Sequence, residues 1–249
     1  PCDEFFVRAG QIGVRDDGTK TVLITGTDAS HITRSLRMKP GERLTVCDMT
    51  KREYDCTVLS LGDNVLLKVD CEKPSDTEPP YSLTLYQALI KGDKFDTVVQ
   101  KSVECGVTRI VPVLTERCVV RLDKDSASKK IVRWQKIAEE AAKQCGRGII
   151  PTVDGLMYYK QALSDAVQST LPLFCYEGQE QMTIADAVKK VPQPDSVSVF
   201  VGSEGGFSAC EAAAADEAGL ISVGLGKRIL RTETASSFAM ACLAFAYEL

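Results

Sequence analysis

A glycine-rich segment near the C-terminus has residue types and spacing suited to binding a small molecule. Three glycines lie within five residues, in the run Gly202-Ser203-Glu204-Gly205-Gly206, directly after a short apolar run. Glycine lets the backbone turn tightly and approach a ligand closely. The next helix opens with Ser208 and has Glu211 three residues on, which predicts a capping box, and a loop feeding a helix N-terminus can bind an anion. The alternative is a tight structural turn. The spacing fits neither GxGxxG nor a P-loop, which disfavours sites for NAD and for nucleoside triphosphates.

A second loop, residues 226–235, sets charged groups beside apolar ones. Ile229 and Leu230 are followed by Arg231 and Glu233, and a nearly uncharged helix is predicted over residues 235–249. A helix that is apolar almost all round is usually buried in a core or an interface. Arg231 and Glu233, at the entrance of this helix, are either functional groups or an ion pair at a surface turn.

Both loops belong to a region of alternating strands and helices, residues 81–249. Apolar runs at 83–90, 109–114, 171–176, 197–201 and 220–224 predict strands, and one-face apolar stripes at 93–105 and 129–145 predict helices. This alternation is typical of an α/β fold with a mainly parallel sheet covered on both faces. Ligands of such sheets bind beyond the carboxyl ends of the strands, which is where both loops lie.

The first 73 residues have a different rhythm. Short β-rich runs at 21–24, 43–47, 54–59 and 65–69 are separated by Gly, Asp and Asn turns, and one helix is predicted over 31–38. This pattern predicts a small β-barrel. The polar, proline-containing stretch 74–80 is predicted to be a linker.

Composition excludes several classes of protein. With 249 residues, 44% of them hydrophobic and 26% charged, the chain is globular. Its net charge of −4 excludes a uniformly basic nucleic-acid wrapper. Two segments are nevertheless basic: 34–52 holds six basic against two acidic residues, and 91–147 holds thirteen against eight. Each segment is either a phosphate-binding surface or a solvated face.

The chain shows no sign of a metal site or a membrane span. Its ten cysteines are scattered without a CxxC pair, which favours reduced thiols in the cytoplasm. The single histidine, His31, excludes a His-rich zinc site and is expected to be structural. No apolar run approaches the ~20 residues that span a bilayer, and the acidic first four residues are unlike a secretory signal.

The two loops, in the runs 201–208 and 225–235, resemble the signature of SPOUT-class RNA methyltransferases. The resemblance is strongest to the ribosomal RNA small-subunit methyltransferase E family, and it extends to 91–101, 114–121 and 133–147. The run 31–41 resembles the PUA-like RNA-binding domain of that family. Departures are small: Ser203 stands where Pro is common, and residues 47–49 replace a Gly-bearing turn.

The resemblance implies a fold, an activity and partners. The fold would be a SPOUT-type parallel sheet tied in a trefoil knot, preceded by a PUA-like barrel. The activity would be S-adenosylmethionine-dependent methylation of N3 of a 16S rRNA uridine, 1498 in the standard rRNA numbering. Naked 16S rRNA or the assembled small subunit would be the substrate, and the enzyme would be a homodimer that needs no metal. The alternatives are a SPOUT enzyme acting on another RNA and a catalytically silent RNA-binding factor.

The resemblance also assigns roles to residues. Arg231 would stabilise negative charge on the uracil carbonyls, and Glu233 or Glu204 would accept the N3 proton. The alternatives are that Glu204 orders its loop and that Glu233 complements the helix dipole. RNA would be held by Arg34, Arg37, Lys39, Arg117 and Arg147, although Arg117 and Arg147 could equally form structural ion pairs. The cofactor would lie among Phe174, Tyr176, Glu177, Val201, Gly202, Ser203, Glu204, Gly205, Gly206, Leu225, Gly226, Ile229, Leu230, Arg231, Thr232 and Thr234.

Overall fold

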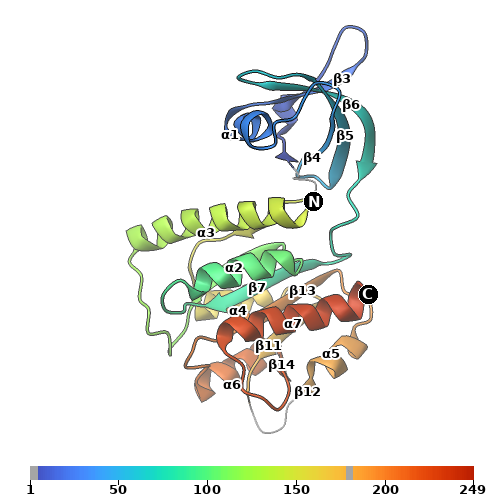
Figure 1. The fold of residues 1–249 in the computed structure, drawn as a ribbon. Coiled ribbons are helices and arrows are strands. Elements are labelled where there is room, and N and C mark those ends of the chain that lie inside the picture. The colour runs from blue at the N-terminus through green and yellow to red at the C-terminus, as the bar shows by residue number, and fades with distance from the viewer. Residues whose placement is uncertain (1–4, 178–181) are drawn as a thin grey trace. The chain divides into compact units, whose positions relative to one another are not determined.

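The computed structural model describes residues 5–177 and 182–249, which form two compact units (Figure 1). The first unit contains the chain up to Glu78 together with Ala142–Ile150. The second contains Pro79–Ala141 and Pro151–Leu249. The division between Glu78 and Pro79 falls inside the predicted linker, whereas the membership of residues 142–150 in the first unit was not predicted.

The first unit is a curled six-stranded sheet with strand order β1-β4-β5-β6-β3-β2. All strand pairs in this sheet are antiparallel except the parallel pair β1–β4. The elements are β1 (Phe5–Phe6), η1 (Ala9–Gln11), β2 (Ile12–Val14), β3 (Lys20–Ile24), α1 (Gly26–Ser30), η2 (His31–Ser35), β4 (Arg43–Cys47), β5 (Arg52–Ser60) and β6 (Val65–Pro74).

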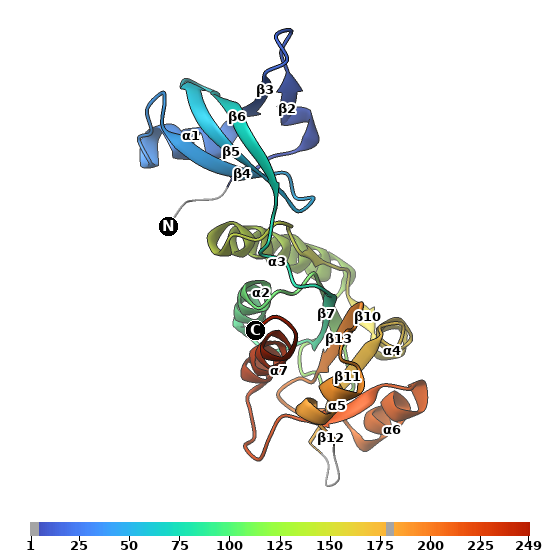
Figure 2. The same cartoon turned by 90° about the vertical axis from the view of Figure 1, so that its right-hand side faces the viewer.

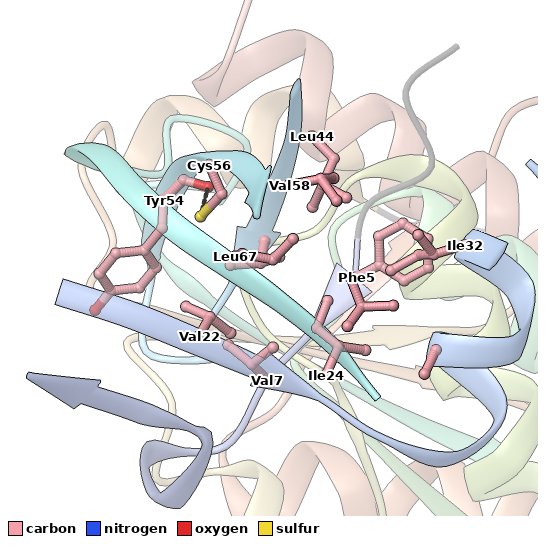
Figure 3. Packing of buried hydrophobic residues seen from close by; sticks show 13 residues of the cluster. Phe5, Val7, Val22, Ile24, Ile32, Leu44, Tyr54, Cys56, Val58 and Leu67 are labelled. Carbon is pink, nitrogen blue, oxygen red and sulfur yellow. Dashed lines mark hydrogen bonds between the residues drawn. The ribbon is translucent and has the colours of Figure 1, made fainter. Parts of the chain in front are cut away.

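Alternation along the strands produces the core of this unit. In β5, Tyr54, Cys56 and Val58 are buried while the residues between them are not, as expected for a sheet with one covered face. Figure 3 shows these side chains meeting Val22, Leu67 and others inside the curl. The four strands predicted here are therefore confirmed.

The helix predicted over residues 31–38 has the wrong bounds. An α-helical segment covers Gly26–Ser30 and is followed by a π-helical turn, in which the Leu36 amide donates to the His31 carbonyl at 2.9 Å. The helical segment ends before Arg37, which has a left-handed φ of 53° and cannot continue a right-handed helix.

Arg147 holds residues 142–150 to the rest of the first unit. Its guanidinium donates two parallel hydrogen bonds of 2.8 Å to the Glu78 carboxylate, and both side chains are at most 4% exposed. The backbone amide of Gly148 donates to the same carboxylate at 2.8 Å. The prediction that Arg147 contacts RNA is therefore wrong. The side chain is buried and committed to a bidentate ion pair, which is the structural alternative.

The second unit alternates strands and helices as predicted. Its elements are β7 (Ser82–Ala88), α2 (Lys94–Glu104), β8 (Arg109–Leu114), α3 (Lys124–Cys145), β9 (Thr152–Val153), β10 (Met157–Tyr158), α4 (Tyr159–Ala166), β11 (Leu171–Cys175), β12 (Met182–Thr183), α5 (Ile184–Lys190), β13 (Ser196–Val201), α6 (Ala209–Ala218), β14 (Ile221–Gly224) and α7 (Thr232–Tyr247).

All strand pairs of the second sheet are parallel, in the order β10-β8-β7-β13-β11-β14-β12 with β9 beside β8. Helices α2 and α7 cover one face of this sheet, and α4 and α6 cover the other (Figure 2). The central strands β13 and β7 are almost wholly buried, which explains their nearly continuous apolar sequences. The predicted α/β architecture with a parallel sheet is confirmed.

Two helices begin earlier in the chain than predicted. Helix α3 begins five residues earlier than the predicted residue 129. Most of its apolar stripe is buried, with Trp134 stacked on Phe95 at 4.0 Å between ring centroids. Helix α7 begins at Thr232 rather than at residue 235, so Glu233 lies within its first turn. As a result, Arg231 occupies the N-cap position of α7 and Glu233 lies inside the helix.

Candidate functional site

Three loops at the carboxyl edge of the parallel sheet enclose a cavity of about 790 Å³. They follow β11, β13 and β14, which are neighbours in the sheet, so their ends meet at one place. A cavity of this size is in the range of small-molecule sites, which is about 300–1,000 Å³. Of the sixteen residues predicted to hold a cofactor, all but Phe174 and Thr234 line it.

The glycine run after β13 forms a tight turn along one wall. The Gly206 amide donates to the Ser203 carbonyl at 2.9 Å, and Gly206 has a left-handed φ of 63°. A Cβ atom on Gly202 would come within 3.2 Å of the Gly206 backbone and of the Phe207 ring. The turn therefore needs glycine at two positions, one for conformation and one for space.

A buried hydrogen-bond network holds this turn against two other elements. The Thr232 hydroxyl at the start of α7 donates to the Gly202 carbonyl at 2.6 Å. The side-chain amide of Gln87, at the end of β7, donates to the Thr232 hydroxyl at 3.0 Å and to the Gly202 carbonyl at 3.3 Å. The Ser236 hydroxyl donates to the Gln87 amide oxygen at 2.5 Å. Gln87 and Ser236 are fully buried, and neither was predicted as a site residue.

The loop after β8 packs on the outside of the same turn. The Arg117 guanidinium donates to the Gly205 carbonyl at 3.0 Å, and the Ser203 hydroxyl donates to the Arg117 carbonyl at 3.3 Å. Arg117 is exposed and lines the cavity, so its cation lies at the mouth of the site. The predicted capping box of Ser208 and Glu211 is confirmed just beyond this turn.

Arg231 stands at the mouth of the cavity as an exposed cation. It occupies the N-cap position of α7, where its side chain makes no capping hydrogen bond, and the structure gives its guanidinium no partner among the described residues. A cation at a helix N-terminus opposes the helix dipole. Nearby, the Ile229 side chain is 86% exposed beside the cavity. A ligand bound in the cavity would stabilise both the unfavourably placed Arg231 cation and the exposed Ile229 side chain.

The two candidate bases differ in what their oxygens contact. Oε1 of Glu204 accepts a hydrogen bond from the Lys91 amide at 3.0 Å. Glu233 lies 3.9 Å from the Lys94 ammonium through Oε1, while its Oε2 is buried and has no partner among the described residues. Glu233 therefore has a hydrogen-bond acceptor to offer to a ligand, and Lys94, which also lines the cavity, was not predicted.

Phe174 does not line the cavity, and its assignment as a cofactor contact is corrected. The ring is 0% exposed and packs 4.4 Å from the Phe207 ring in the core behind the glycine turn. Its neighbour Cys175 does line the cavity, and burial raises the pKa of the Cys175 thiol to about 12, so the thiol is protonated and a poor nucleophile. Thr234 is exposed and outside the cavity lining.

The predicted RNA-binding residues of the first unit form an exposed basic surface. Arg34, Arg37 and Lys39 are all exposed, on η2 and the turn that follows it. His31 and Arg34 line a shallow hollow of about 630 Å³ together with the Ser30 and Ser35 side chains. These three cations are therefore accessible to a polyanion.

Among residues 5–177 and 182–249, no group of His, Cys, Asp and Glu side chains is arranged to hold a metal ion. No helix within these ranges is long and apolar enough to cross a membrane.

Comparison with known proteins decides which family this geometry belongs to. The model of the RNA methyltransferase domain matches residues 77–244, and that of the RNA methyltransferase PUA domain matches residues 24–70. The ribosomal RNA small subunit methyltransferase E of Bacillus subtilis is 32% identical over 92% of this chain and 91% of its own length. The chain belongs to the ribosomal RNA small subunit methyltransferase E family.

Solved structures of methyltransferases agree with this family over nearly the whole chain. The family member from Neisseria gonorrhoeae, solved with S-adenosylmethionine, is 31% identical, covers 99% of this chain and 98% of its own, and has a TM-score of 0.82. A methyltransferase of Legionella pneumophila, solved with the same cofactor, has a TM-score of 0.81 at 31% identity over 99% of this chain. The predicted family, its methyltransferase class and its PUA-like first domain are confirmed.

The buried network predicts a specific loss of stability. Thr232→Val removes the hydroxyl that bridges Gln87 and Gly202 while keeping the side chain's shape, which leaves buried polar groups without a partner. We expect the free energy of unfolding to fall by about 1–3 kcal/mol, measured by urea denaturation.

The matched control is Thr234→Val, which makes the same chemical change two residues along at an exposed position. It should alter stability by less than about 0.5 kcal/mol. Equal effects of the two substitutions would show that the network does not stabilise the fold.

Proposed function

We propose that this protein transfers the methyl group of S-adenosylmethionine to N3 of a uridine in the 16S rRNA of the small ribosomal subunit. The observation that carries the proposal is the cavity itself, in which the glycine turn lies beside a cation without a partner, Arg231, and the unpaired Oε2 of Glu233. Membership of the family and the two relatives solved with the cofactor support it. We extend the proposal to the SPOUT-type trefoil knot.

The residues of the cavity fit S-adenosylmethionine. The tight turn at 202–206 brings backbone amides and carbonyls to the wall, where they can pair with an adenine or ribose. Ile229 and Leu230 supply apolar surface for the adenine ring. The space at Gly226 is open and its φ is 103°, so backbone can lie directly against the ligand there. Cofactor contacts at these positions are part of the proposal.

The cofactor supplies a methyl group activated by an adjacent sulfonium. Glu233 would accept the proton of uridine N3, which would leave the N3 electron pair free for the methyl carbon that the bound cofactor would supply. Arg231 holds the negative charge that spreads to the uracil carbonyls. Glu204 is assigned the ordering of the glycine turn, because its Oε1 is already bound to the Lys91 amide.

The direct test is methylation with labelled S-adenosylmethionine, using 30S particles and naked 16S rRNA in parallel. Nucleoside analysis should find 3-methyluridine in at least one of the two substrates. Another methylated nucleoside would indicate a different SPOUT activity. RNA binding without any methylation would indicate a silent RNA-binding factor.

Arg231→Ala separates chemistry from cofactor binding. Loss of a fixed charge-stabilising donor typically costs about 10²–10³ in rate, so the single-turnover rate should fall by that factor. The affinity for S-adenosylmethionine, measured by calorimetry, should change much less, because in the proposal backbone holds the adenosine. Equal losses of rate and affinity would show that Arg231 shapes the pocket instead.

We propose that Arg34, Arg37 and Lys39 bind RNA phosphates in the first unit and that Arg117 does so at the cavity mouth. The double substitution Arg34→Gln with Arg37→Gln should weaken RNA binding and flatten its dependence on salt by about 1.4–1.8 units of slope. Lys189→Gln with Lys190→Gln removes the same charge from the exposed end of α5 and serves as the control. Identical salt slopes for the two double variants would contradict this role.

We also propose that the protein is a homodimer that acts in the cytoplasm. Helix α7 supports the first statement, because Phe238 is 37% exposed and Phe245 is 75% exposed, seven residues apart on one face. Burial of exposed apolar surface of this kind drives association. Sedimentation velocity should show a species of twice 27.1 kDa, and a concentration-independent monomer would contradict the proposal. An rRNA substrate supports the second statement.

A further inference from the structure

The N-terminal turn of α2 places a lysine between the two acidic residues of the cavity. The Lys94 ammonium lies 3.8 Å from Glu204 Oε1 and 3.9 Å from Glu233 Oε1. The three residues come from three elements, namely α2, the glycine turn after β13 and the first turn of α7. All three side chains line the same cavity.

The charges of this cluster do not balance. One ammonium faces two carboxylates, and the two contacts that it makes both use Oε1 atoms. The opposite oxygen of Glu233 is buried without a partner among the described residues. One carboxylate is therefore in excess, and the Glu233 carboxylate has one oxygen that no hydrogen-bond donor of the described residues satisfies.

Lys94 stands where a cation is intrinsically unfavourable. It is the first residue of α2, whose N-terminus carries the positive end of the helix dipole. Its side chain is 37% exposed and neither contact is as short as a good hydrogen bond. A pair of this kind stabilises a fold very little, so fold stability does not explain the placement.

We infer that Lys94 is a positioning residue for methyl transfer, which holds the Glu233 carboxylate in the orientation that accepts the N3 proton of the substrate uridine. This inference rests on the proposed function. Lys94 contacts the carboxylate and not the reacting atoms, so its loss affects the reaction through the orientation of Glu233. The other cations that line the cavity, Arg117, Lys227, Arg228 and Arg231, form no ion pair with Glu233 and cannot take the place of Lys94.

The test compares Lys94→Met with Lys94→Arg. Lys94→Met should lower the single-turnover rate at saturating RNA by about tenfold or more, since misplacing a catalytic group by about 1 Å can cost up to about 10². The KM for RNA and the affinity for S-adenosylmethionine should stay within about threefold. Lys94→Arg, which keeps the charge, should recover most of the rate.

The matched control is Lys101→Met on the same helix, which breaks only the surface ion pair with Glu104 and should leave the rate unchanged. A raised KM for RNA with an unchanged rate in Lys94→Met would show that Lys94 only binds RNA phosphates, and would overturn the inference. Equal losses of rate, RNA binding and cofactor affinity in Lys94→Met that Lys94→Arg does not recover would also overturn the inference.

A readout without substrate separates this inference from the proposed function. The ¹³C carboxyl resonance of Glu233, identified by its loss in Glu233→Gln, should be displaced in Lys94→Met and unchanged in Lys101→Met. An undisplaced resonance in Lys94→Met overturns the inference even if the enzyme makes 3-methyluridine. The Glu233 resonance could be displaced in Lys94→Met as expected while the wild-type protein makes no 3-methyluridine. That result would overturn the proposed function and, with it, the role of Lys94 in methyl transfer.

Discussion

The carbonyl oxygen of Gly202 is the point on which the site depends. It accepts hydrogen bonds from Thr232 and Gln87, which come from the start of the last helix and the end of the first strand of the second unit. Both donors are buried, so leaving either unpaired would cost free energy. Strand β7 is thus fixed to two segments more than a hundred residues further along the chain, at the wall of the cavity.

This arrangement explains why the charged groups can be placed against local preference. Arg231 caps a helix N-terminus without a hydrogen bond, and Lys94 begins another helix, and both positions disfavour a cation. The buried network and the packing of α2 on α7 hold these helices in place regardless. Stability supplied by the core therefore lets the cavity keep charges whose arrangement suits a ligand.

The sequence predicts what depends on local patterns. Strand β8 and the capping box at Ser208 both follow from neighbouring residues, and both are present. The start of α7 was missed by three residues, because Thr232 to Thr234 are polar and the predicted helix was traced by its apolar positions.

Side-chain partners could not be predicted in the same way. Gln87 lies in an apolar strand, and nothing within several residues of it indicates that Gly202, Thr232 and Ser236 surround its amide. An arginine in a sequence looks the same whether it binds RNA or pairs with a carboxylate. Only the fold shows that Arg147 is buried against Glu78. Phe174 lies in a strand as predicted, but its side chain packs against Phe207 and does not face the cavity.

The central claim is that the glycine turn, held through Gly202, forms the cofactor pocket. Calorimetric titration of S-adenosylmethionine into Gly202→Ala tests it most directly, because the added methyl would meet the Gly206 backbone at 3.2 Å. Gly155→Ala is the control, since a Cβ atom there meets nothing within 4 Å. We predict at least a tenfold loss of affinity in Gly202→Ala, equivalent to about 1.4 kcal/mol, and none in Gly155→Ala. A folded Gly202→Ala protein with unchanged affinity would contradict the account.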